Sequence, residues 1–295
     1  MIKIFKGAFT AIVTPFKENE AIDELALRNL VEFQKKKKID GIVPCGTTGE
    51  SPTLDYEEHQ KVIEIVVESA NGEVPVIAGT GSNSLKEAID MTKHAADAGA
   101  DASLQVCPYY NKPTQEGLYR HFSEIAKSVD IPIIIYNIHG RTCINLETST
   151  LAKLANEHSN IVGVKEASGN IAQMMDVIDA LPKNFAVLSG DDNFTLPLMS
   201  LGGKGVISVA SNIIPDEMHE LTDSALSGNF KKAMELHYKF LPLFKGIFIE
   251  TNPIPIKAAL AMKGMIKEVY RLPMCEMKAE HKEKLKKILK DLKLI

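Results

Sequence analysis

Short runs rich in β-branched and other apolar residues alternate along this chain with longer amphipathic segments. Several runs are apolar at consecutive positions, as in Ile131-Pro-Ile-Ile-Ile135, which is typical of parallel strands covered by helices. The pattern predicts eight strands, at Gly7–Val13, Gly41–Cys45, Val74–Gly79, Ala102–Cys107, Ile131–Tyr136, Ile161–Lys165, Ala186–Ser189 and Gly205–Ala210.

The segments between these runs carry apolar residues at helical spacing. In the first of them, the capping residue Asp23 precedes Leu27, Leu30 and Val31. Eight βα units indicate an α/β protein of the (β/α)8 TIM-barrel class. The alternative is a doubly wound open sheet, but no Gly-x-Gly-x-x-Gly opens the first helix. The predicted helices are Asp23–Lys38, Asp55–Ala70, Ser84–Ala98, Thr114–Val129, Leu146–His158, Asn170–Leu181, Asp192–Leu201 and Pro215–Ser227.

The last part of the chain departs from this alternation and is helical throughout. Breaks at Pro253, Pro255 and Pro273 indicate about three helices. No linker separates this part from the barrel. We therefore predict a barrel with the catalytic site over residues 1–227 and a C-terminal helical region over 228–295 that packs on it.

Composition narrows the class of protein further. Of the 295 residues, 45% are hydrophobic and 24% are charged, so most of the chain is expected to fold. The net charge of −4 provides no basic field for nucleic acid. No apolar stretch reaches the roughly 18 residues of a membrane helix, and residues 1–6 do not resemble a signal peptide. The cysteines, at positions 45, 107, 143 and 275, lack metal or redox spacing, which favours reduced thiols in a cytoplasmic protein.

Candidate chemistry lies where the predicted strands end, because active sites of (β/α)8 barrels form at that face. Lys165 follows the buried-type run Ile161-Val-Gly-Val164. It could be a lysine that simply leaves the barrel for solvent. A desolvated lysine in this position is also the nucleophile of Schiff-base enzymes, because burial leaves more of the amine neutral.

Other strand ends offer polar groups, each with a plainer interpretation beside the functional one. The turn Gly46-Thr-Thr-Gly-Glu50 could receive a carboxylate on its backbone N–H groups and hydroxyls, or be an ordinary helix-capping turn. Tyr136 could fill the core or relay protons within a chain of hydroxyls. Arg141 could form a surface ion pair or bind a substrate carboxylate. Tyr109-Tyr110 could be interface aromatics.

Taken in order, these residues resemble the dihydrodipicolinate synthase family of the pyruvate-dependent class I aldolase superfamily. The resemblance extends from about Gly7 to Pro273. It rests on Gly46-Thr-Thr-Gly-Glu50, Pro108-Tyr-Tyr-Asn111, Tyr136-Asn137 followed by Arg141-Thr142, Gly163-Val-Lys-Glu-Ala167, Ser189-Gly-Asp-Asp192, Gly202-Gly-x-Gly-Val-Ile-Ser208 and Asn252-Pro-Ile-Pro255.

The resemblance implies a lyase that condenses pyruvate with L-aspartate 4-semialdehyde in diaminopimelate and lysine biosynthesis. Lys165 would form an imine with pyruvate, and Tyr136 would move protons beside it. Thr48 would link Tyr136 to Tyr110, which is contributed across a tight dimer interface. No cofactor and no metal is implied, and the expected assembly is a homotetramer built as a dimer of dimers.

The resemblance also implies how the substrates are held. Thr47 and Thr48 would bind the pyruvate carboxylate, and Arg141 the carboxylate of the aldehyde substrate. Gly190 and Ile207 would line the pocket with their backbone carbonyls. Many family members have a proline where this chain has Ile138-His-Gly140, which puts the rigidity of the Arg141 loop in question. We interpret His139 as a tolerated loop residue.

Some members of the family are inhibited by L-lysine at a cleft of the dimer interface. The chain matches the lysine-sensitive pattern at most of the corresponding positions, while a tyrosine replaces a histidine seen in some members. We therefore hypothesise lysine feedback at Ser51, Tyr56, His59, Asn83, Glu87 and Tyr109.

Two other functions compete with this one. N-acetylneuraminate lyases and 2-keto-3-deoxy sugar acid aldolases of the same superfamily share the lysine and the tyrosine, but generally lack counterparts of Arg141 and Glu166. A non-catalytic barrel acting as a sensor need not retain the whole set of Lys165, Tyr136, Thr48, Tyr110 and Arg141. Both comparisons favour the synthase.

Overall fold

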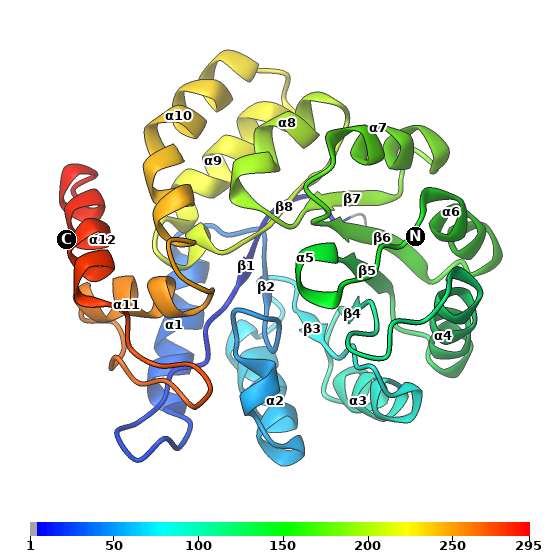
Figure 1. Cartoon of the computed structure of the whole chain (residues 1–295), viewed down its shortest axis with the longest axis horizontal. Helices are drawn as coiled ribbons and strands as arrows, with labels where there is room; N and C mark the ends of the chain where they lie inside the picture. Colours follow the sequence, from blue (N-terminus) through cyan, green and yellow to red (C-terminus); the bar gives the residue numbers. More distant parts are fainter. Residues whose placement is uncertain (1–4) are drawn as a thin grey trace.

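A computed structural model describes residues 5–295 of the chain. The first four residues, on which the signal-peptide prediction partly rests, lie outside this range. In the described part, eight parallel strands alternate with helices, as the hydrophobic pattern predicts (Figure 1). The strands are β1 (Gly7–Ala11), β2 (Gly41–Val43), β3 (Ile77–Gly79), β4 (Ala102–Val106), β5 (Ile133–Asn137), β6 (Ile161–Glu166), β7 (Ala186–Ser189) and β8 (Gly205–Ser208).

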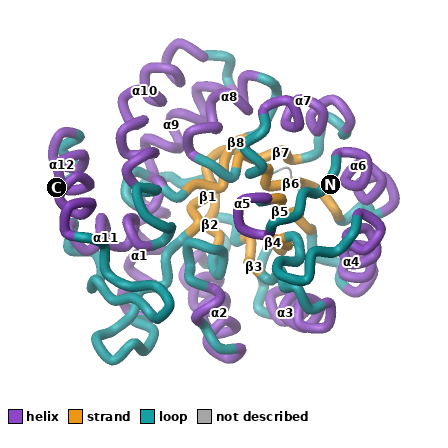
Figure 2. Tube along the Cα trace, viewed as in Figure 1, coloured by secondary structure: helices purple, strands orange, loops and turns teal. Residues whose placement is uncertain are grey.

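The strands form a nearly closed ring in the order β2-β1-β8-β7-β6-β5-β4-β3. The two ends of this order, β2 and β3, meet through a single parallel bridge between Ile42 and Val76. Figure 2 shows the strands at the centre and the helices around them. The predicted (β/α)8 barrel is therefore confirmed.

The helices begin where the sequence offers capping groups. Asp55 forms a capping box with Glu58, and the Ser84 and Thr114 side chains accept hydrogen bonds from the first turns of their helices. The helices around the barrel are α1 (Glu24–Lys36), α2 (Tyr56–Ala70), α3 (Leu85–Asp97), α4 (Gln115–Ser128), α6 (Thr148–Glu157), α7 (Ile171–Ala180), α8 (Thr195–Ser200) and α9 (Pro215–Leu226).

Two details differ from the predicted helices. The segment predicted as one helix over Asp192–Leu201 starts with a 3-10 turn at Asp192–Phe194 and continues as α8. The segment after β5, predicted as a loop, contains the one-turn helix α5 (His139–Thr142). In Figure 1, α5 lies over the centre of the strand ring.

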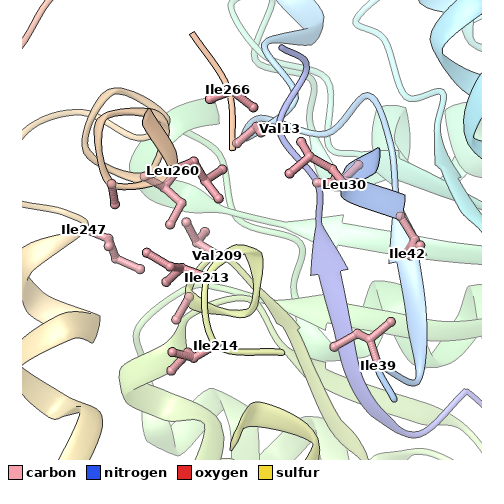
Figure 3. Close-up of a cluster of buried hydrophobic side chains, with 14 of the residues drawn as sticks. Val13, Leu30, Ile39, Ile42, Val209, Ile213, Ile214, Ile247, Leu260 and Ile266 are labelled. Carbon is pink, nitrogen blue, oxygen red and sulfur yellow. The ribbon is translucent and has the colours of Figure 1, made fainter. Parts of the chain in front are cut away.

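Apolar side chains form separate layers inside and outside the barrel. The inner layer includes Phe9, Leu104, Tyr136, Leu188 and Ile207, which alternate with outward-facing residues of the strands. A larger cluster lies between part of the barrel and its helices (Figure 3).

The C-terminal region shares this larger cluster with the barrel. It contains α10 (Phe230–Gly246), α11 (Ile254–Met262) and α12 (Ala279–Asp291), which matches the predicted count of three helices over the described residues. Figure 3 shows Ile247 and Leu260 packed near Val209 and Ile213 from the last barrel strand and the turn after it. The boundary between residues 227 and 228 stays a prediction. Among residues 5–295, no helix is long and apolar enough to cross a membrane.

Candidate active site

Lys165 and Tyr136 are neighbours across the barrel wall. They are register partners on β6 and β5, at the ends of the two strands. Their side chains both point inward, and the Lys165 Nζ lies 4.1 Å from the centre of the Tyr136 ring. Both are buried, with exposures of 6% and 5%. The sequence placed the two residues at strand ends, and the register brings them into contact.

Burial changes the chemistry of the Lys165 amine. Desolvation lowers its pKa to about 7, a direction that the positive charge of Arg141 reinforces and the carboxylates of Asp192 and Asp191 oppose. An ordinary lysine has a pKa of about 10.4. A large fraction of Lys165 is therefore neutral near pH 7, as a nucleophilic amine requires.

Gly190 allows the Lys165 side chain to occupy this position. It follows β7, and its N–H donates to the carbonyl of Glu166 over 2.9 Å. A Cβ at this position would lie 2.5 Å from Cβ of Ala167, and 3.1 Å from Cε and 3.3 Å from Cγ of Lys165. Ile207, predicted with Gly190 to line the pocket, is fully buried in the inner layer of the barrel. The predicted contacts of both backbone carbonyls with substrate stay predictions.

The threonine turn differs from the prediction in one respect. The threonine side chain that lowers the pKa of the Tyr136 phenol is that of Thr47, whereas the sequence analysis assigned the link with Tyr136 to Thr48. The hydroxyl of Thr48 instead accepts a hydrogen bond from Nδ2 of Asn252 over 2.9 Å. The reason is geometric, because consecutive residues of a tight turn direct their side chains differently.

The Tyr136 phenol is protonated at neutral pH. Burial raises its pKa to about 12, while the Arg141 charge and the Thr47 hydrogen bond lower it and Asp191 raises it. The phenol is therefore suited to donate a proton to an oxygen or nitrogen beside it and to take one back through the Thr47 hydroxyl.

Internal hydrogen bonds hold the threonine turn. The N–H of Gly49 donates to Gly46 and that of Glu50 to Thr47, both over 3.1 Å. These two N–H groups are therefore occupied and do not receive a carboxylate, although the sequence analysis considered the whole turn for this role. At Gly49, a Cβ would approach the backbone of Cys45 and Ile12 within 3.3 Å, so a larger residue would be tightly packed there.

Arg141 lies on α5, and the hydrogen bonds of this one-turn helix order the segment that carries Arg141. The N–H groups of Thr142 and Cys143 donate to Ile138 and His139, and the Thr142 hydroxyl adds a bond to the Ile138 carbonyl over 2.9 Å. Nη2 of Arg141 donates to the backbone carbonyl of Asn252 over 3.1 Å. The absence of the proline therefore leaves an ordered turn.

A cavity of about 490 Å³ opens at this end of the barrel. Thr47, Tyr136 and Arg141 line it, together with several residues of the predicted lysine cleft. Lys165 lies beneath its wall, against Tyr136. The structure thus brings Lys165, Tyr136, Thr47 and Arg141 together at one site.

Tyr110 is the predicted relay residue that this chain does not bring to its own site. Its side chain is 89% exposed, and its backbone has a positive φ of 70° in the loop after β4. Tyr109 beside it is 40% exposed and lines the cavity. The proposed relay through Tyr110 therefore needs a second copy of the chain.

The predicted lysine cleft forms the outer part of the same cavity. Glu87 accepts a short hydrogen bond from Ser82, and Nδ2 of Asn83 donates to the Tyr109 carbonyl over 3.2 Å. Burial lowers the pKa of His59, whose Nε2 lies 2.7 Å from the Gly79 carbonyl. Of the six predicted residues, those that line the cavity are Ser51, Tyr56, His59, Glu87 and Tyr109.

Two polar residues near the site received no role in the sequence analysis. Asn252 was noted only within Asn252-Pro-Ile-Pro255, and Asp192 only within a motif after β7. Burial raises the pKa of Asp192 to about 6, while hydrogen bonds from Ser208, Ala210 and Val209 lower it. A buried asparagine next to proline has no distinctive spacing, so its contacts appear only in three dimensions.

The described residues contain no group of three or more His, Cys, Asp or Glu side chains arranged to hold a metal ion. The prediction that the reaction uses no metal and no cofactor stays a prediction.

The fold and the site together define a (β/α)8 enzyme of the Schiff-base lysine class, with a buried amine beside a phenol at the barrel mouth. Comparisons with known proteins specify the family. Residues 4–292 match the family model described as the dihydrodipicolinate synthetase family, and the chain belongs to this family.

Relatives and solved structures match over the full chain. The 4-hydroxy-tetrahydrodipicolinate synthase of Syntrophus aciditrophicus is 59% identical, over 99% of this chain and 100% of that protein. A chloride-inhibited dihydrodipicolinate synthase from Acinetobacter baumannii, crystallised with pyruvate, is 45% identical with a TM-score of 0.97, covering 99% and 100% of the two chains. A lysine-bound enzyme from Cyanidioschyzon merolae is 42% identical with a TM-score of 0.96, covering 99% of each chain.

Proposed function

We propose that this chain is a 4-hydroxy-tetrahydrodipicolinate synthase, a lyase that condenses pyruvate with L-aspartate 4-semialdehyde in diaminopimelate and lysine biosynthesis. The observation that carries the proposal is the buried Lys165 amine over the Tyr136 ring, at the mouth of a (β/α)8 barrel. The full-length relative that shares 59% of its residues bears this activity in its name.

Lys165 performs the covalent chemistry in this proposal. Its neutral amine attacks the ketone carbon of pyruvate, and loss of water gives an imine. Loss of a methyl proton converts the imine to an enamine, whose carbon attacks the aldehyde of the second substrate. The amine of that substrate then attacks the imine carbon, closes the ring and releases Lys165. Each atom comes from the two substrates and the lysine, so no cofactor is required.

Tyr136 and Thr47 move the protons of these steps. The phenol donates a proton to the departing hydroxyl of the carbinolamine that Lys165 forms with pyruvate, and it receives one during ring closure, with the Thr47 hydroxyl as its hydrogen-bond partner. Tyr110 of a second copy completes the relay. The exposure of Tyr110 and Tyr109 supports this assembly, and the complete homotetramer is part of the same proposal.

The remaining polar groups hold the substrate carboxylates. Thr47 and Thr48 present hydroxyls on the turn after β2 and bind the carboxylate of pyruvate. Arg141 directs its guanidinium to the cavity and binds the carboxylate of the aldehyde substrate. The backbone carbonyls of Gly190 and Ile207 face the bound substrate. These local groups supply the positive charge that a chain with a net charge of −4 lacks overall.

We propose L-lysine as a feedback inhibitor that binds the outer part of the cavity. Burial raises the pKa of Tyr56, the carboxylates of Asp90 and Glu87 raise it further, and these two groups provide negative charge for an ammonium group. The lysine-bound structure from Cyanidioschyzon merolae supports the same ligand here. A cytoplasmic location is supported by the four free cysteines of the described chain.

The decisive experiment traps the covalent intermediate. The protein is incubated with pyruvate, reduced with borohydride, digested and analysed by mass spectrometry, with the Lys165→Met variant as control. A pyruvate adduct on Lys165 is expected in the wild type alone, and absence of the adduct there rejects the Schiff-base mechanism. A coupled assay offering aspartate semialdehyde, N-acetylmannosamine and small sugar aldehydes then identifies the acceptor.

A further inference from the structure

Asn252 connects the two sides of the active site. It precedes α11, in a part of the chain more than a hundred residues from Arg141 and about two hundred from the threonine turn. Its side-chain Nδ2 donates to the Thr48 hydroxyl over 2.9 Å, and its backbone carbonyl accepts from Nη2 of Arg141 over 3.1 Å. The residue is 4% exposed.

A second contact from the same segment holds the end of the threonine turn. Lys257 on α11 forms an ion pair with Glu50, and both side chains are buried from solvent. The Lys257 Nζ also lies 4.2 Å from the centre of the Phe16 ring and 5.4 Å from that of Tyr270. Separating a buried ion pair leaves an unpaired buried charge, which is strongly destabilising. The pair with Lys257 therefore fixes the position of Glu50 at the end of the turn.

The threonine turn needs such support because its backbone is strained at both ends. Cys45 has a φ of 55° and Glu50 a φ of 54°, which are left-handed values that residues other than glycine seldom adopt. The surrounding structure must hold such a conformation. Asn252 and Lys257 contact Thr48 and Glu50 and so support the Glu50 end of the turn, from one segment of the C-terminal region that Figure 1 shows adjoining the barrel beside α1.

We propose that residues 252–257 form a positioning clamp for the active site, in which Asn252 orients the Thr48 hydroxyl toward pyruvate and Lys257 fixes the turn that carries it. This inference rests on the proposed function, since it assigns a role in pyruvate binding. Asn252 and Lys257 are positioning residues, because they act through Thr48 and Glu50. In this proposal, the C-terminal helical region positions residues of the active site.

The first experiment removes the amide of Asn252 while leaving the backbone carbonyl for Arg141. Asn252→Ala and the near-isosteric Asn252→Leu are both prepared, so that a folded variant is available if one of them does not fold. Asn160→Ala is the matched control, because Asn160 lies just before β6, at the opposite end of the barrel, and donates two hydrogen bonds to the backbone carbonyls of Ala126 and Val129. For each protein, the KM of each substrate, kcat and Tm are measured.

The expected result is specific to one substrate. Loss of one hydrogen bond that orients a substrate-binding group raises the KM for pyruvate about tenfold, while the KM for aspartate semialdehyde and kcat change by less than about threefold. Asn160→Ala keeps the wild-type KM for pyruvate. An unchanged pyruvate KM in the Asn252 variants, or an equal rise for both substrates, overturns the clamp.

A double-mutant cycle tests whether Asn252 acts through Thr48. The effect of Asn252→Ala on the pyruvate KM should disappear in a Thr48→Val background, which lacks the accepting hydroxyl. Persistence of the full effect there contradicts the proposal. The wild type is first tested for the borohydride-trapped adduct on Lys165. Absence of that adduct rejects the proposed function, whereas an adduct with unaffected Asn252 variants rejects the clamp alone.

Discussion

The Nζ of Lys165 lies 4.1 Å from the centre of the Tyr136 ring, because β6 and β5 pair these two residues directly in register. The ring covers the amine and excludes water from it. The same contact places a phenolic proton donor beside the amine that we propose forms the imine. The pairing of β5 with β6 therefore both desolvates the amine and places a proton donor beside it.

The lowered pKa of Lys165 predicts the pH dependence of imine formation. Because the amine reacts only when neutral, the rate of borohydride-trapped adduct formation should be half-maximal near the pKa of about 7. It should fall about tenfold for each pH unit below that point and level off above it. The measurement is the initial rate of adduct formation at saturating pyruvate from pH 5 to 9. A midpoint above pH 9 would show that the amine is not desolvated.

Asp192 should shift this midpoint. Its negative charge raises the pKa of Lys165, so Asp192→Asn removes a charge that favours the protonated amine. The midpoint of the same pH profile should move down, by about half a unit to one unit. Asp191 exerts a smaller effect in the same direction, which makes Asp191→Asn the matched comparison with a smaller expected shift. A midpoint that rises in Asp192→Asn contradicts this account.

Thr47, rather than Thr48, should cooperate with Tyr136. Thr47→Val should reduce kcat about tenfold by removing the hydrogen-bond partner of the phenol. In a Tyr136→Phe background the same change should have almost no further effect, because the shared interaction is already lost. Thr48→Val, in contrast, should raise the KM for pyruvate equally in both backgrounds. Additive effects of Thr47→Val and Tyr136→Phe on kcat would remove Thr47 from the relay.

Gly190→Ala should displace the nucleophile. The added Cβ would lie 2.5 Å from Cβ of Ala167 and 3.1 Å from Cε of Lys165, so the chain around Lys165 must shift to admit it. A displacement of this kind should slow adduct formation by about a hundredfold. Gly140→Ala on α5 is the control, because a Cβ there has no neighbour within 4 Å. Equal rates for wild type and Gly190→Ala would show that the lysine tolerates the methyl group.

L-lysine should inhibit the enzyme and raise its Tm, since its ammonium group meets the carboxylate of Glu87 in the outer part of the cavity. Glu87→Gln should weaken inhibition about tenfold through loss of that charge. L-norleucine, which has the same carbon chain and the same α-ammonium group but lacks the side-chain ammonium, serves as the control ligand. If saturating L-lysine leaves both the rate and the Tm unchanged, the cleft does not bind it.

The sequence alone determined the architecture of this protein and pointed to most of its candidate reactive residues. The apolar runs before Lys165 and Tyr136 are typical of buried parallel strands, and the parallel strands of a barrel direct their last residues to one face of it. Helix starts at Asp55 and Ser84 were equally predictable, because capping depends on residues only three positions apart. These features depend on residues that are close together in the chain, so they can be predicted from a single sequence.

Only the tertiary structure decided which groups contact one another. The exchange of Thr48 for Thr47 beside Tyr136 depends on how a tight turn directs two adjacent side chains. The contacts of Asn252 with Thr48 and Arg141 join residues separated by 204 and 111 positions, and no local pattern reports such pairs. The lowered pKa of Lys165 likewise arises from burial by the folded barrel, which a sequence implies but does not measure.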